Sequence, residues 1–113
     1  MNFEFSYGAV LYTKKNDIYE YLIIKDRHES YSFPKGHIKK NETEMECAVR
    51  EVKEETGIDM VPNPSFFYGI EYPIGNSITK YVYYYMADIK EMEPYINDGE
   101  VKEILLLPYE ESL

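Results

Sequence analysis

The sequence is short of the residues that crosslink or anchor a protein. Its 113 residues include one cysteine and no tryptophan, and no apolar run approaches the length of a membrane span. A single cysteine excludes an intramolecular disulfide and a zinc site built from several thiolates. Apolar runs such as Ile104–Leu107 are far shorter than the roughly 20 residues that cross a bilayer. Met1–Glu4 carry no basic segment of a secretory signal. We therefore expect residues 1–113 to form one cytoplasmic domain.

Positive charge is also scarce. The chain has 21 acidic residues against 12 lysines and arginines, which gives a formal net charge of −9 and a sequence pI near 4.7. Such a surface repels the backbone of a nucleic acid, so we expect neither nucleic acid nor membrane as a partner. A small polyanionic substrate would be repelled as well, unless divalent cations bridge it to the acidic residues.

Apolar and polar residues alternate in a pattern typical of a mixed α/β domain. Runs rich in aromatic and β-branched residues predict strands, and the turn residues between them predict loops. The predicted strands cover residues 3–13, 18–25, 66–72, 79–89 and 101–107. No repeat or linker divides the chain.

One helix is predicted after residue 40. Asn41 followed by Glu44 fits an N-terminal capping box, and Gly57 fits a left-handed C-terminal stop. Between them, apolar residues recur at the spacing of one buried helical face, namely Met45, Ala48, Val49 and Val52.

The same helix carries three glutamates on another stripe. At about 100° per residue, Glu54 and Glu55 fall on either side of Glu51. Clustered carboxylates repel one another, and hard oxygen ligands of this kind suit Mg²⁺ or Mn²⁺. Because the chain has 16 glutamates, an ordinary solvated acidic face is the alternative interpretation.

The residues around these glutamates form one longer pattern. Gly36, Glu42, Arg50-Glu51-Val52, Glu54-Glu55 and Gly57-Ile58 read as G-x5-E-x7-R-E-U-x-E-E-x-G-U, where U is aliphatic. This segment resembles the Nudix box at every specified position. The resemblance covers about a fifth of the chain and implies an α/β/α sandwich with a mixed sheet. It also implies Mg²⁺- or Mn²⁺-dependent hydrolysis of a nucleoside diphosphate linked to another moiety.

The resemblance also implies roles for individual residues. Glu51 and Glu55 would be the principal metal ligands, joined by Glu54 and by the carbonyl of Gly36. Arg50 would orient the glutamates; an ordinary ion pair along the helix is its alternative role. The base that accepts the proton of the attacking water would be a box glutamate or a later acid, for which Glu100 is the first candidate and Glu103 the second. Cys47 is expected to be a small helix residue rather than a nucleophile.

The segment before the box narrows the substrate. Ser32-Phe33-Pro34-Lys35-Gly36-His37 is similar to the F-P-K-G-H segment of the diadenosine tetraphosphate hydrolases, although diphosphoinositol polyphosphate phosphohydrolases carry related P-K-G segments. Lys35 and His37 would bring cationic donors to a polyphosphate. Lys80 would contact phosphate in the same way, and Tyr72 would stack on an adenine ring.

The resemblance predicts hydrolysis of a dinucleoside polyphosphate. The alternatives within the class are ADP-ribose, a nucleoside triphosphate such as 8-oxo-dGTP, or a capped RNA 5′ end, which the acidic balance disfavours. A non-catalytic Nudix-fold nucleotide sensor is the alternative from another class; because the box glutamates are all present, we favour an enzyme.

Nudix domains usually continue into a C-terminal helix that packs on the sheet. Residues 108–111 look like the first turn of such a helix, which would be short or missing here. Uncovered apolar surface would favour a homodimer.

Overall fold

The fold is a single mixed sheet with a helix on one face. The computed structural model describes residues 2–90, 92–96 and 99–108. Its elements, in chain order, are β1 (Asn2–Lys15), β2 (Ile18–Asp26), β3 (Tyr31–Ser32), β4 (Lys35–His37), α1 (Glu44–Thr56), β5 (Asn63–Ile74), β6 (Ile78–Asp88) and β7 (Val101–Pro108). The five predicted strands and the helix are therefore present, each with slightly wider or narrower bounds. A helical turn is predicted from residues 108–111. Pro108 is the last residue of β7, and residues 109–111 lie outside the described residues.

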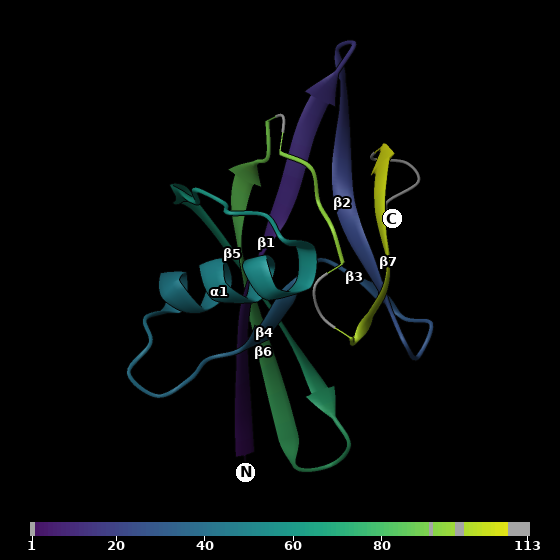
Figure 1. Ribbon diagram of the computed structural model, residues 1–113. Coiled ribbons are helices and arrows are strands. Elements are labelled where there is room, and N and C mark those ends of the chain that lie inside the picture. The colour runs from purple at the N-terminus through teal and green to yellow at the C-terminus, as the bar shows by residue number, and fades with distance from the viewer. Residues whose placement is uncertain (1, 91, 97–98, 109–113) are drawn as a thin grey trace.

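Within the described residues, seven strands join in the order β3-β2-β1-β6-β5, with β4 also paired to β1 and β7 to β2. β1 and β6 run parallel, whereas the other pairs are antiparallel. β1 is long enough to pair with β2 at its end and with β4 near its middle, so the short β4 lies directly beside the central strand (Figure 1). This arrangement brings the segment before the box to the centre of the sheet.

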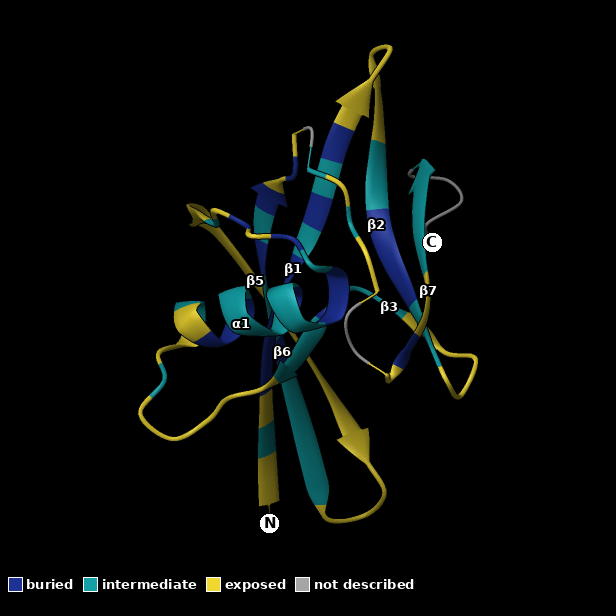
Figure 2. Cartoon of the chain, in the orientation of Figure 1, coloured by how far each residue is buried: buried dark blue, intermediate teal, exposed yellow. Residues whose placement is uncertain are grey.

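The core lies between α1 and the upper part of the sheet, where Figure 2 shows the buried segments. Alternate residues of β1 and β6 face the helix, as the period of a strand requires. The buried cluster includes Tyr7, Ala9, Leu11, Leu22, Ile24, Cys47, Ala48, Val52, Tyr85 and Ala87. The predicted apolar face of the helix is thus confirmed, with Met45 and Val49 partly buried at its edge. Among the described residues, no helix is long and apolar enough to cross a membrane.

The N-terminal cap of α1 differs from the prediction by two residues. Thr43, not Asn41, is the cap: its hydroxyl accepts from the backbone N–H of Glu46, whose carboxylate accepts from the Thr43 N–H. Asn41 instead adopts a left-handed conformation, with φ 67°. The sequence contains both capping-box patterns, and the later one leaves Glu42 outside the helix. Gly57 ends the helix as predicted, at φ 75°.

Candidate functional site

Arg50 is the centre of the side-chain network on α1. Its guanidinium forms a forked pair with Glu42, with Nε 2.6 Å from one carboxylate oxygen and Nη2 3.0 Å from the other. The pair lowers the pKa of Glu42 to about 2, first through Arg50 and then through the backbone N–H of Lys39. The same contact raises the pKa of Arg50, so both groups are ionised at neutral pH. Glu42 is outside the helix and holds Arg50 in place.

Arg50 in turn holds two of the helix glutamates. Its Nη1 donates to Glu51 at 2.8 Å and to Glu54 at 3.2 Å, and Nη2 donates to the carbonyl of His37 at 2.9 Å. The guanidinium therefore ties α1 to β4 and offsets the repulsion between the carboxylates. Glu54 keeps the more open position of the two, with 45% of its side chain exposed against 15% for Glu51.

Gly36 leaves the space in which the Glu51 carboxylate lies. The carboxylate packs directly on the Gly36 α-carbon, where a side-chain β-carbon would overlap it. Behind it, the Cys47 thiol donates to the Gly36 carbonyl with sulfur and oxygen 3.5 Å apart. Burial raises the pKa of Cys47 to about 11, so the thiolate that a nucleophile requires is disfavoured. Glycine is therefore needed at position 36, because a β-carbon there would not let the Glu51 carboxylate approach the backbone so closely.

Glu55 faces a different neighbour. It is 8% exposed, and one of its carboxylate oxygens accepts the backbone N–H of Lys35 at 2.9 Å. Burial and then the Lys80 ammonium lower the pKa of Lys35, while Glu55 acts in the opposite direction. Lys35 on β4 is therefore influenced by both Glu55 on α1 and Lys80 on β6.

The register of the sheet places the remaining polar candidates. Lys80 pairs with Tyr72 on β5, so their side chains share one face. Tyr84 lies on that face four residues further along β6, and burial, followed by the charges of Tyr72 and Glu55, raises its pKa to about 12. Sequence reasoning missed Tyr84 because it is one of 13 tyrosines; its position at even spacing from Lys80 was the available signal.

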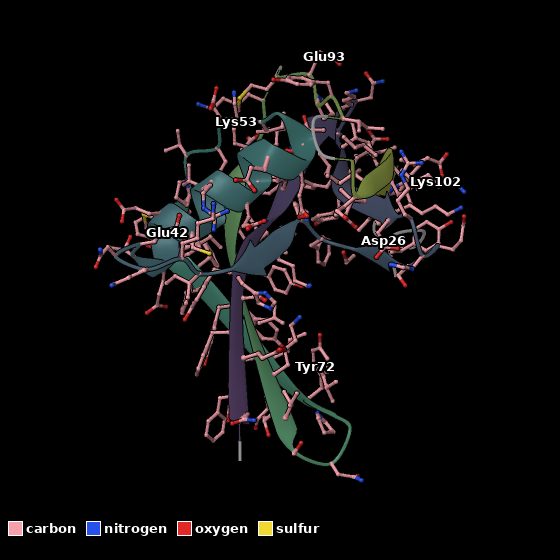
Figure 3. The ribbon with its side chains drawn as sticks, turned by 60° about the horizontal axis from the view of Figure 1, so that its bottom comes forward. Asp26, Glu42, Lys53, Tyr72, Glu93 and Lys102 are labelled. Carbon is pink, nitrogen blue, oxygen red and sulfur yellow. The ribbon has the colours of Figure 1, made fainter. Side chains whose placement is uncertain are left out.

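His37 and Glu100 are less closely connected to the other candidate site residues. The carbonyl of His37 is tied to Arg50, while its side chain is exposed at the edge of β4. Glu100 immediately precedes β7, and its carbonyl accepts the N–H of Arg27 at 3.2 Å. Asp26, which pairs with Val101, lies on the opposite side of Figure 3 from Glu42. A catalytic role for Glu100 stays a prediction.

The donor set suits a hard divalent cation. The carboxylates of Glu51, Glu54 and Glu55 and the carbonyl of Gly36 all offer oxygen atoms, on two adjoining elements. In the described part of the chain, however, no three acidic, histidine or cysteine side chains converge closely enough to hold a metal. Arg50 and the Lys35 N–H take up carboxylate oxygens of these residues. Metal binding would therefore require the glutamates to turn from these partners.

Residues 3–113 match the NUDIX domain family, and the chain belongs to that family. The match extends the resemblance of the Gly36–Ile58 segment to nearly the whole chain. The mixed sheet with the box helix packed on it is the expected fold. The second helical layer of an α/β/α sandwich would follow Pro108, beyond the described residues.

Similar proteins carry more than one activity in their names. The chain is 30% identical over 83 residues to the asymmetrical bis(5′-nucleosyl)-tetraphosphatase of Rattus norvegicus. This match covers 69% of this chain and 56% of that protein. It is 53% identical over 39 residues to the m7GpppN-mRNA hydrolase of Saccharomyces cerevisiae, or 34% of this chain and 4% of that one. The C. elegans Ap4A hydrolase binary complex superposes with a TM-score of 0.87 at 23% identity, over 96% of this chain and 82% of that chain. The last comparison establishes the fold alone.

Proposed function

We propose that this protein is a divalent-metal-dependent Nudix pyrophosphohydrolase that cleaves a dinucleoside polyphosphate by attack of water on phosphorus. The observation that carries the proposal is the meeting of Glu55 with Lys35 and Lys80. A buried carboxylate of the box helix accepts the backbone N–H of Lys35, and the Lys35 ammonium is influenced by the charges of both Glu55 and Lys80. Carboxylates would bind metal, and ammonium groups would bind phosphate, within a single site.

Each side chain then has a defined task. Lys35 and Lys80 bind the phosphates beyond the one attacked, and Tyr72, on the same sheet face as Lys80, offers an aromatic surface to a base. Arg50 holds Glu51 and Glu54 in position. His37 is a further candidate contact at the rim.

A bound Mg²⁺ or Mn²⁺ would neutralise phosphate charge and lower the pKa of the attacking water. Glu51, Glu55, Glu54 and the Gly36 carbonyl are the proposed ligands. Because Glu54 is the most exposed of the three glutamates, it is also the side chain best placed to accept the proton of that water. Glu100 is the alternative base.

The test is a panel of substrates with Mg²⁺ or Mn²⁺, containing diadenosine tetraphosphate, ADP-ribose, 8-oxo-dGTP and a capped RNA. We expect ATP and AMP from the tetraphosphate. The Glu54→Gln variant should lose about 100-fold or more of the turnover if Glu54 accepts the proton. Glu93→Gln is the matched control, because this exposed glutamate lies apart from Glu42 and Tyr72 in Figure 3. Absence of metal-dependent turnover of every compound would favour a nucleotide sensor.

Hydrolysis of capped RNA is the second candidate function. The identity of 53% over 39 residues with a yeast mRNA hydrolase favours it. The net charge of −9 opposes binding of the RNA body, although it does not oppose binding of the cap itself. Preference for capped RNA over diadenosine tetraphosphate in the panel would select this function.

We also propose that a homodimer covers exposed apolar surface. Phe3 and Phe5 on β1 and Phe67 on β5 are large apolar side chains with 52%, 41% and 43% exposure. Their positions along paired strands place all three on one sheet face. Elution as a monomer in gel filtration would contradict a dimer.

A further inference from the structure

Ser6 is an unusual residue in the middle of the sheet. It is 1% exposed, and its hydroxyl has no hydrogen-bond partner. Among the described residues, it is the one buried side chain whose oxygen or nitrogen lacks such a partner. A buried hydroxyl without a partner destabilises the folded protein. The neighbouring residues on its face show what the hydroxyl could bind.

The register places Ser6 between the two lysines. On one side of it along β1, Gly8 pairs with Lys35; on the other side, Glu4 pairs with Lys80. Residues two apart on a strand share a face, so Ser6 and both lysines lie on the same face. Ser6 is in the row between them.

The two lysines approach Ser6 from different strands. Lys35 lies on β4 and Lys80 on β6, at pairs on opposite sides of Ser6 along β1. His37 pairs directly with Ser6 from β4, and the buried Val82 pairs with it from β6. The buried hydroxyl thus lies on the sheet face that also carries the two lysines.

We propose that Ser6 is a substrate-contacting residue whose hydroxyl donates a hydrogen bond to a phosphate oxygen held between Lys35 and Lys80. An anion entering between the ammonium groups relieves their mutual repulsion and parts the side chains that cover the hydroxyl. The hydroxyl then gains the partner that it lacks. This inference rests on the proposed function, because it assigns the phosphate subsite of that site.

The carboxylate of Glu4 should weaken anion binding at this site. Glu4 shares the face and pairs with Lys80, so its carboxylate opposes an incoming anion. Removing this charge should strengthen anion binding, whereas removing the Ser6 hydroxyl should weaken it. The two effects have opposite signs at neighbouring positions.

The test uses inorganic tripolyphosphate as the probe, in low-salt buffer with EDTA, so that the metal ligands take no part. Isothermal titration calorimetry of the full chain should show binding that Ser6→Ala weakens by about 10-fold, in line with a hydrogen bond to a charged group. Ser6→Thr, which keeps the hydroxyl, should retain binding. Ser77→Ala, in the exposed turn between β5 and β6, is the matched control and should bind as the parent does. Glu4→Gln should bind more tightly.

Thermal unfolding without the anion separates contact from structural support. Ser6→Ala should be as stable as the parent or more stable, because the unpartnered hydroxyl is gone. A Ser6→Ala variant that binds tripolyphosphate like the parent, or a parent that does not bind it, overturns the inference. If diadenosine tetraphosphate is hydrolysed but Ser6→Ala binds normally, the proposed function stands and this inference fails. If no tetraphosphate is hydrolysed but Ser6→Ala weakens binding, the subsite stands and the proposed substrate is wrong.

Discussion

Replacing Arg50 by glutamine should destabilise the whole domain, because one side chain connects the loop before α1, the helix and β4. Arg50→Gln removes the pair with Glu51, in which the two side chains are 21% and 15% exposed, and the hydrogen bond to the His37 carbonyl. We assign about 1–2 kcal/mol to the partly buried pair, below the 3–5 kcal/mol of a fully buried one, and about 1 kcal/mol to the hydrogen bond. The lost contacts with Glu42 and Glu54 act in the same direction.

The expected loss in the free energy of unfolding is therefore at least about 2–3 kcal/mol, which lowers the Tm of a domain of this size by roughly 10–15 °C or more. Urea denaturation gives the free energy, and thermal unfolding gives the Tm. Lys53→Gln is the control, because it removes an ion pair with Asp59 whose side chains are 42% and 77% exposed. That variant should shift the Tm by no more than about 2 °C. Equal stability of the Arg50 and Lys53 variants would refute the central role assigned to the guanidinium.

Three further predictions follow from the contacts of the site. Gly36→Ala should keep the fold but displace the Glu51 carboxylate, because a β-carbon at position 36 would meet that flexible group. The circular dichroism spectrum should be unchanged while turnover falls. Undiminished turnover would contradict this placement of Glu51. The pKa of Glu42, about 2 against an ordinary 4.5, means that its contribution to stability is present above pH 4.5 and is lost as the pH falls toward 2. The Tm difference between the parent and Glu42→Gln should shrink over that window; a difference independent of pH would count against the ion pair. Native Cys47 should react with iodoacetamide at pH 8 far more slowly than the unfolded chain, because the thiol is buried and its pKa is about 11, and equal rates would show that it is accessible.

Much of this molecule follows from local patterns in the sequence. The strands, the helix and its buried face depend on the period at which apolar residues recur, and that period is readable without knowing the fold. Gly57 had one physical role available, the left-handed residue that ends a helix, and it has that role. The spacing from Gly36 to Ile58 indicated the family before any strand was placed.

The capping box shows where local patterns become ambiguous. Asn41 with Glu44 and Thr43 with Glu46 are both valid caps by spacing. The cap at Thr43 leaves Glu42 outside the helix, where it forms the forked pair with Arg50. Spacing alone does not distinguish the two caps, whereas a contact between residues eight apart accompanies the one that is used.

The proposed phosphate subsite depends on tertiary structure alone. The sequence offered Lys35 and Lys80 as separate candidates 45 positions apart, and nothing local predicted that they converge. Ser6 carried no signal at all, because a serine in a strand becomes informative when its burial and lack of partners are known. The sequence by itself determined which residues the chain could use for chemistry. Pairing of β1 with both β4 and β6 determined which of them meet, because strand pairing joins residues far apart in the chain.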